Sequence, residues 1–266
     1  MRIRTVRLRG QISQGICFPL SILPEGTLIE ENVDVTEILG IEKFEAPVPA
    51  NLGGVAKGMF PGFIPKTDET RVQVLQDVLD FYSGEICYVT EKLDGSSSTI
   101  YLRDEVFGVC SRNLDLVDDG ENSMWKFVKE NNLEEKLRSF GKNIALQGEI
   151  IGEGIQKNKY KLRGQSIHFF NVFDIDKFEY FSFEEFCKTI SGFGLQIVPV
   201  LEENFILTNS ISSLIEKSKM RSTLNKDTWA EGIVIRPLKE NFDKKIMKGR
   251  VSFKAINPEF LIKHGE

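Results

Sequence analysis

A lysine at a tight turn between two expected strands is the feature that most constrains how this chain can fold. Residues 86–90 and 98–103 read as strands, and the sequence Glu-Lys-Leu-Asp-Gly-Ser occupies residues 91–96. Such a turn holds the amine of Lys92 beside the carboxylate of Asp94, where the amine can attack a phosphoryl or carbonyl centre. An ordinary surface turn has the same pattern, so its meaning depends on the rest of the chain.

Length and composition indicate a chain with a packed core. The 266 residues suit one large domain, or one domain with a small appendage, and 41% of them are hydrophobic. The net charge of −5 argues against a surface that is basic all over, as in a protein that binds nucleic acid on every face. A basic groove on one face is still compatible with that net charge.

The cysteines and histidines exclude several classes of site. The four cysteines lie far apart and share no C-x-x-C spacing, so they indicate reduced thiols in a cytoplasmic protein rather than zinc ligands or disulfides. The chain has two histidines, His168 and His264, which argues against a multi-histidine metal site, and we expect His168 to be a core or edge residue. No apolar run reaches membrane-spanning length, and no secretory signal opens the sequence.

A Pro- and Gly-rich stretch, residues 45–65, predicts a connector near a domain boundary. We therefore expect a β-rich N-terminal segment over residues 1–45, with a short helix at 35–39, and one larger domain over 46–266. In the larger domain the apolar spacing predicts helices over 68–81 and 122–140. A capping box at Ser182 predicts a third helix, and an Asn-Pro pair at 257–258 a last one. Because strands and helices mix without βαβ alternation, we predict an α+β domain with largely antiparallel sheets flanked by helices.

Three charged residues fall on otherwise apolar expected strands. Glu149 and Glu231 each lie among Gly, Ile and Val residues, and Lys254 ends a similar strand. A carboxylate in such a strand needs a partner or a metal, and a salt bridge is the simplest partner for each residue alone. Gathered around Lys92, these residues would supply a nucleophile, carboxylates for a divalent cation and a cation for a phosphate, which nucleotidyl transfer requires.

The chain resembles the covalent nucleotidyltransferase superfamily of ATP-dependent ligases and capping enzymes, and within it the RNA ligases. Six segments match its motifs in family order: residues 91–95 (motif I), 111–113 (Ia), 146–152 (III), 169–175 (IIIa), 231–236 (IV) and 252–254 (V). Together they cover roughly residues 60–260 and form a specific set. The resemblance implies an ATP-grasp-like nucleotidyltransferase domain, and residues 4–15 and 39–45 are similar to part of an N-terminal OB-fold module.

The resemblance implies an ATP-dependent RNA ligase. Lys92 would attack the α-phosphate of ATP and form a lysyl-AMP, with Mg²⁺ or Mn²⁺ as the divalent cation. AMP would then pass to the 5′-phosphate end of an RNA or RNA-containing duplex, and a 3′-hydroxyl would displace it to seal the strand at a nick, as in RNA repair. A DNA ligase, a GTP-dependent capping enzyme and a non-catalytic nucleic-acid-binding relic are the alternatives.

Roles follow for the matched residues. Catalysis would involve Lys92, Asp94, Glu149, Glu231 and Lys254, with Glu149 and Glu231 on the metal directly or through water. The nucleotide would contact these residues together with Arg71, Glu91, Arg112 and Phe170. Phe170 would stack on adenine, for which a planar side chain is suited, and Lys254 would hold the α-phosphate.

Two expectations concern charge around the nucleophile. Motif V of many RNA ligases has a second lysine where this chain has Ser252, so Arg250 or Lys248 would share its phosphate contact. The amine of Lys92 must lose its proton before attack, since its reference pKa is roughly 10.4. We expect the clustered Arg and Lys residues to disfavour its charged form.

Overall fold

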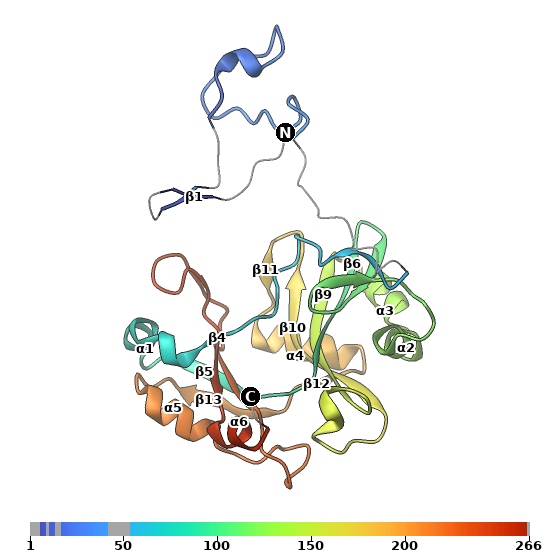
Figure 1. Cartoon of the computed structure of the whole chain (residues 1–266), viewed down its shortest axis with the longest axis vertical. Coiled ribbons are helices and arrows are strands. Elements are labelled where there is room, and N and C mark those ends of the chain that lie inside the picture. Colours follow the sequence, from blue (N-terminus) through green and yellow to red (C-terminus); the bar gives the residue numbers. More distant parts are fainter. Residues whose placement is uncertain (1–5, 9–10, 14–16, 42–53, 265–266) are drawn as a thin grey trace. The chain divides into compact units, whose positions relative to one another are not determined.

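The computed structural model describes residues 6–8, 11–13, 17–41 and 54–264, in two compact units, Met1–Pro47 and Val48–Glu266. In the first unit (Figure 1), β1 (Val6–Leu8) and β2 (Gln11–Ser13) form an antiparallel hairpin, and η1 (Leu20–Ile22) is a short 3-10 helix. The helix expected at 35–39 is wrong, because this stretch forms turns that end at Gly40. The OB-like assignment stays a prediction, since parts of its two segments lie outside the described residues.

The second unit is built on two sheets. The sheet that we call the β9 sheet has the order β11-β10-β9-β6-β7-β8-β3, with β12 beside β10, and the β5 sheet has the order β13-β5-β14-β17-β4. The β9 sheet comprises β3 (Ala56–Met59), β6 (Ser96–Arg103), β7 (Val106–Cys110), β8 (Leu114–Leu116), β9 (Ile144–Gly152), β10 (Gln165–Asp174), β11 (Glu179–Tyr180) and β12 (Gln196–Ile197). The β5 sheet comprises β4 (Thr70–Arg71), β5 (Ile86–Lys92), β13 (Val200–Ile206), β14 (Gly232–Pro237) and β17 (Phe253–Ile256), while β15 (Phe242–Asp243) and β16 (Gly249–Arg250) form a separate ribbon.

Pairing within both sheets is mainly antiparallel, which confirms the predicted α+β class. The parallel pairs are β10 with β12 and β17 with β4. His168 on β10 is buried, as expected, and one ring nitrogen lies 3.3 Å from the carbonyl oxygen of Ile197.

Helices cover each sheet (Figure 1). Helices α2 (Ser123–Glu130), α3 (Leu133–Phe140) and α4 (Phe183–Gly192) bury apolar residues against the β9 sheet, and α1 (Gln76–Tyr82) and α5 (Ile211–Ser218) do so against the β5 sheet. The capping box of Ser182 and Glu185 starts α4 as predicted, and α6 (Pro258–His264) starts at the predicted proline. Among the described residues, no helix is long and apolar enough to cross a membrane.

Two expected helices are shorter than predicted. The stretch 122–140 divides into α2 and α3 because Asn132 has a left-handed backbone (φ 50°), which asparagine tolerates better than most residues. The stretch 68–81 is helical in the α form only from Gln76, because Arg71 pairs with β17 and residues Val72–Val74 form the 3-10 helix η3. Tertiary strand pairing therefore overrides the local helical spacing.

The chain crosses from one sheet to the other directly after Lys92. Strand β5 ends at Lys92 in the β5 sheet, and β6 begins at Ser96 in the β9 sheet, so residues 93–95 make the crossing. Gly95 is required there, since a Cβ atom at this position would lie 2.3 Å from the carbonyl oxygen of Ile150. The crossing places the end of β5 against β9, where the candidate site forms.

We expect Gly232→Ala to destabilise the protein by about 2–3 kcal/mol, in the range of overpacked cores. The Cβ atom of an alanine at position 232 would lie 2.2 Å from the backbone oxygen of Ala255, so β14 and β17 would have to separate. Urea unfolding measures the change. Gly192→Ala in α4, where a Cβ meets no atom within 4 Å, is the matched control and should not lower stability. Equal stability of the two variants would contradict this account of the β14–β17 contact.

Candidate active site

The end of β5 and residues of both sheets line a cleft that is open to solvent and has about 440 Å³ of empty space. Lys92 and Glu91 come from β5, Glu149 from β9 and Phe170 from β10. The full lining is Thr67, Glu69, Thr90, Glu91, Lys92, Leu93, Glu149, Phe170, Val198, Val234 and Arg236.

Lys92 is ion-paired within the cleft. Its Nζ donates a hydrogen bond to Oε2 of Glu231, at 2.6 Å. Burial by itself would lower the pKa of Lys92, but the negative charges of Glu231 and Glu149 outweigh burial and raise it. The expectation that neighbouring cations would disfavour the charged amine is therefore wrong for the nucleotide-free protein, because carboxylates are the dominant neighbours.

The two glutamates are held differently. Glu149 lies on β9 opposite Ser97 of β6, and its Oε1 accepts a hydrogen bond from the backbone N–H of Gly95 at 3.2 Å. Burial, together with the charge of Glu231, raises the pKa of Glu149 to about 7 despite the nearby Lys92. Burial also raises the pKa of Glu231, against the opposing effect of Lys92.

Lys254 and Arg71 form a cationic edge next to the cleft. Arg71 of β4 is in register with Lys254 of β17, and Lys254 is in register with Val234 of β14, which lines the cleft. Burial and then the positive charge of Lys92 lower the pKa of Lys254. The charges of Lys254 and Lys92 therefore interact in the folded protein.

Asp94 is bound by a loop that no motif includes. Its carboxylate lies 2.8 Å from Nζ of Lys159, and its backbone N–H donates to the hydroxyl of Tyr160 at 2.7 Å. Both side chains of the ion pair are nearly buried, with exposed fractions of 8% for Lys159 and 11% for Asp94. This contact fixes the turn that follows Lys92.

Glu91 is a buried part of the cleft lining, with 1% of its surface exposed. Its Oε2 accepts hydrogen bonds from the backbone N–H and the hydroxyl of Thr223, at 2.9 and 2.5 Å. Its Oε1 is buried and has no hydrogen-bond partner among the residues that the structure describes. A buried acceptor of this kind is costly unless a ligand donates to it.

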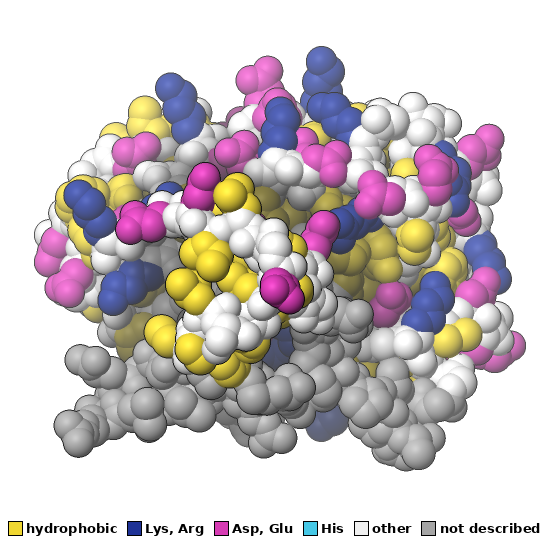
Figure 2. Space-filling model, turned by 90° about the horizontal axis from the view of Figure 1, so that it is seen from above, with side chains coloured by type: hydrophobic (Ala, Val, Ile, Leu, Met, Phe, Trp, Pro, Cys, Tyr) yellow, Lys and Arg dark blue, Asp and Glu magenta, His cyan; other side chains and the backbone are white. Residues whose placement is uncertain are grey.

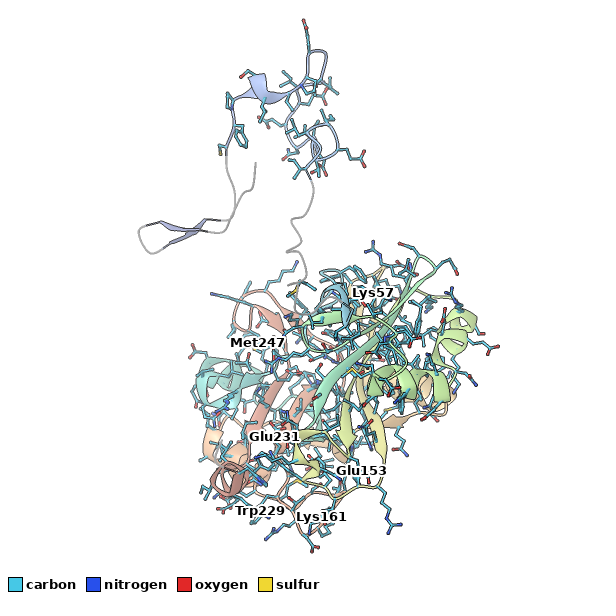
Figure 3. All side chains as sticks on the ribbon, turned by 45° about the vertical axis from the view of Figure 1, so that its right-hand side comes forward. Lys57, Glu153, Lys161, Trp229, Glu231 and Met247 are labelled. Carbon is cyan, nitrogen blue, oxygen red and sulfur yellow. The ribbon has the colours of Figure 1, made fainter. Side chains whose placement is uncertain are left out.

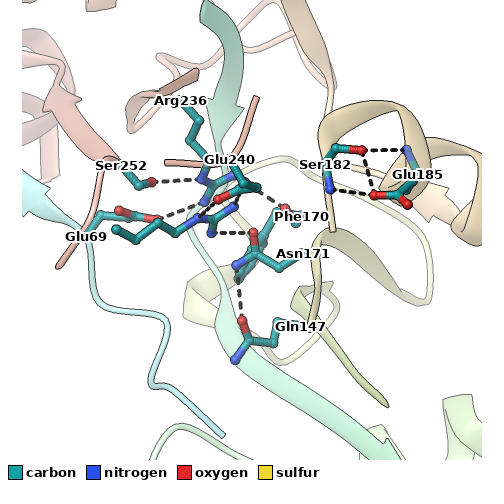
Figure 4. A network of polar contacts seen from close by, with 10 residues as sticks. Glu69, Gln147, Phe170, Asn171, Ser182, Glu185, Arg236, Glu240 and Ser252 are labelled. Carbon is teal, nitrogen blue, oxygen red and sulfur yellow. Dashed lines mark hydrogen bonds and ion pairs between the residues drawn. The ribbon is translucent and has the colours of Figure 1, made fainter. Parts of the chain in front are cut away.

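A second polar network lies at the Phe170 side of the cleft (Figure 4). Arg236, at the end of β14, donates to Oε1 of Glu69 and to the hydroxyl of Ser252, both at 2.8 Å. Arg250 pairs with Glu240 and donates to Oδ1 of Asn171 at 2.7 Å. It also stacks on Tyr180, so protein groups already engage the guanidinium for which we expected a phosphate contact.

Comparison with known proteins finds RNA ligases. The sequence profile of the family described as RNA ligase matches residues 85–256. A single-residue variant of Naegleria gruberi RNA ligase, solved with ATP and manganese, has a TM-score of 0.73 and 40% identity over 99% of this chain and 77% of that chain. The same ligase solved with pyrophosphate has a TM-score of 0.72 and 41% identity over the same shares. No match was found among curated protein sequences.

This chain belongs to the RNA ligase family. The family profile covers all six motif segments completely, from motif I to motif V. The nucleotidyltransferase fold expected from the sequence is confirmed by the solved relatives.

The structure brings most of the predicted site residues of this RNA ligase together. Glu91, Lys92, Glu149 and Phe170 line the cleft, Glu231 bonds Lys92, and Lys254 and Arg71 lie on the adjoining strands. Arg112 does not line the cleft and pairs instead with Asp68 at 2.7 Å, with 66% of its side chain exposed. Arg236, Glu69, Lys159 and Tyr160 were missed, although Arg236 ends the motif IV strand and could have been suspected there.

We expect Glu149→Gln to stabilise the nucleotide-free RNA ligase increasingly as pH rises from 5 to 8. An unfolded glutamate has a pKa near 4.5, whereas the pKa of Glu149 in the folded protein is about 7. Between these pH values Glu149 is therefore protonated in the folded state and ionised in the unfolded state. The wild-type free energy of unfolding therefore decreases as pH rises through 7. Glutamine does not titrate. Between pH 5 and pH 8 the free energy of unfolding of the variant should therefore rise by on the order of 2 kcal/mol relative to that of the wild type.

Thermal unfolding at pH 5 and pH 8 measures the difference. Glu130→Gln, an exposed substitution at the end of α2, is the matched control and should show no such dependence. A pH-independent difference between Glu149→Gln and wild type would exclude a raised pKa at Glu149.

Proposed function

We propose that this chain is an ATP-dependent RNA ligase that works through a lysyl-AMP at Lys92. The observation that carries the proposal is the placement of Lys92 in a cleft beside Phe170, Glu149 and its partner Glu231. The relatives solved with ATP and manganese, AMP and manganese, or pyrophosphate support ATP as the nucleotide. Pyrophosphate and AMP are the two parts into which such a reaction divides ATP.

The cleft offers a site for the adenine base. Phe170 presents a ring for stacking, and Leu93, Val198 and Val234 supply apolar contacts. The unpartnered Oε1 of Glu91 would accept a hydrogen bond from the 6-amino group of adenine. Guanine has an acceptor at that position, so this carboxylate would repel it, which favours ATP over GTP.

Lys92 would attack the α-phosphorus of ATP. A bond forms between Nζ and the α-phosphorus, the bond from that phosphorus to the pyrophosphate oxygen breaks, and the amine proton leaves. Oε2 of Glu231, at 2.6 Å, is the acceptor in reach of that proton. Lys254 is placed to stabilise the charge on the α-phosphate and, through its repulsion of Lys92, to favour the neutral amine.

Glu149 and Glu231 fit a divalent cation that is shared with the nucleotide. Within the described ranges no group of three acidic, histidine or cysteine side chains could bind a metal by itself. Magnesium commonly uses one or two carboxylates together with substrate phosphates and water. When bound, Mg²⁺ or Mn²⁺ would neutralise phosphate charge, and the two glutamates would hold it directly or through water.

In the later steps AMP would pass from Lys92 to the 5′-phosphate at a break in RNA, and the 3′-hydroxyl would displace AMP to form the phosphodiester. We propose nicks in an RNA-containing duplex as the substrate, and RNA repair as the role. The four cysteines are free thiols, which supports a cytoplasmic location.

We expect the wild-type protein to acquire label from α-labelled ATP with Mg²⁺, and Lys92→Ala to acquire none. Electrophoresis under denaturing conditions measures the protein-bound label. Glu231→Ala and Lys254→Ala should slow labelling by about a hundredfold or more, as loss of charge stabilisation does. Labelled GTP should give little product, and preference for GTP would indicate a capping enzyme. A wild type that never acquires label would support a non-catalytic relic.

We expect the purified protein to seal a nick whose 3′-hydroxyl strand is RNA. Matched duplexes that carry RNA or DNA on each side of the nick would be compared for sealed product and for 5′-adenylated intermediate. Equal or better sealing of all-DNA nicks would make the protein a DNA ligase. The same duplex without a 5′-phosphate is the control and should give no product, because AMP then has no acceptor.

A further inference from the structure

The loop between β9 and β10, residues 153–164, has a concentration of basic residues that the family motifs do not include. It contains Lys157, Lys159, Lys161 and Arg163 against one acid, Glu153. Its backbone is also unusual, since four residues that are not glycine have left-handed φ angles of 43° to 59°: Gln156, Lys157, Asn158 and Lys161. A left-handed conformation costs residues other than glycine and asparagine about 1–2 kcal/mol each, and strain of this kind clusters at functional sites.

The inner side of the loop is anchored to the turn after the nucleophile. Tyr160 is 2% exposed, and its hydroxyl accepts the backbone N–H of Asp94. Lys159 pairs with the carboxylate of Asp94 and lies 4.5 Å from the ring centre of Phe260. Asp94 is two residues from Lys92 in the sequence. The position of the loop is therefore fixed relative to the proposed nucleophile.

A second loop, between α5 and β14, packs beside the first. The side-chain amide of Asn225 donates to the carbonyl oxygen of Tyr160 at 3.0 Å. Leu162 and Leu224, one from each loop, pack against the same buried cluster. Figure 3 shows Lys161 of the first loop and Trp229 of the second toward the same end of the second unit. Lys226, next to Asn225, is therefore a neighbour of the first loop.

The outer side carries cations without acidic partners. Lys157, Lys161, Arg163 and Lys226 are exposed, and none of them forms an ion pair with a residue in the described part of the chain. Some cations elsewhere are ion-paired, as Lys126 is with Glu121. Figure 2 shows basic and acidic side chains interspersed on another view of the surface. We call these four residues the basic loop surface.

We propose that the basic loop surface binds the phosphate backbone of the RNA beside the break while its end reacts at Lys92. This inference rests on the proposed function. Residues 161–163 lie one to three positions after Tyr160, so they are within about 11 Å of it along the chain, and Tyr160 itself contacts Asp94. A nucleic-acid duplex carries one phosphate per nucleotide along each strand, so the surface can reach several phosphates next to the reacting end.

The chemistry of these residues fits a backbone better than a base sequence. Lysine ammonium groups act as point charges toward phosphates, and such contacts supply affinity and position without reading sequence. A ligase that seals breaks must hold a strand irrespective of its bases, which this contact provides. Binding should accordingly depend strongly on salt, since each neutralised phosphate releases counterions.

The test compares two triple variants with the same change in charge. Lys157→Gln, Lys161→Gln and Arg163→Gln are combined in one protein, and Lys142→Gln, Lys177→Gln and Lys188→Gln, exposed at other places, in the control. Fluorescence anisotropy with a labelled nicked RNA duplex gives the Kd between about 50 and 200 mM salt. Labelling with α-labelled ATP in the absence of RNA measures the first step separately.

We expect the loop variant to bind the duplex at least tenfold more weakly than the control. The slope of log Kd against log salt should fall by about 2, since each lost phosphate contact removes roughly 0.7–0.9. Protein labelling should stay within twofold of wild type. Binding and a salt slope equal to those of the control would overturn the inference, as would a large loss of labelling in a folded loop variant. A wild type without label at Lys92 would instead defeat the proposed function.

Discussion

The passage of the chain from one sheet to the other at residues 93–95 is the constraint on which this structure depends. Lys92 is the last residue of β5, and four residues later, at Ser96, the chain is a strand of a different sheet. Only glycine fits at position 95, because the chain there touches the backbone of β9. The crossing thereby places a lysine of the β5 sheet opposite Glu149 of the β9 sheet, and neither sheet alone contains the site.

The electrostatics of the cleft describe a resting state. Glu231 and Glu149 keep the amine of Lys92 charged and bound, which raises its pKa although burial opposes this. A nucleophile in this state cannot attack until the balance of charge around it changes. Under the proposed function, a triphosphate with its cation would offset the charge of both glutamates, and Lys254 would then favour the neutral form of the amine. In that case the ion pair would couple nucleotide binding to activation of Lys92.

The serine in motif V has a local explanation. Ser252 accepts a hydrogen bond from Arg236, which is buried and paired with Glu69. A lysine at position 252 would place a second cation against this buried guanidinium, a like-charge contact in a low-dielectric setting. Arg236 also lines the cleft, whereas Arg250 is engaged by Glu240, Asn171 and Tyr180. A positive charge therefore still borders the cleft on this side.

The sequence by itself determined the family, the mixed architecture with antiparallel strands, and the residues around Lys92. These follow from local patterns: the motifs are short, and a capping box or an Asn-Pro pair acts within one helical turn. It did not determine the strand at Arg71 or the pairing of Arg112 with Asp68, because each depends on a partner far along the chain. It also did not show the break at Asn132, since asparagine tolerates the left-handed backbone found there but does not require it.

Only the tertiary structure decided the sign of the pKa change at Lys92 and the contact of Lys159 with Asp94. A sequence shows how many charges a chain carries, but the folding of two sheets onto one crossing decides which charges meet. Electrostatic energy depends on the distance and burial of each pair, and no spacing along the chain encodes these quantities.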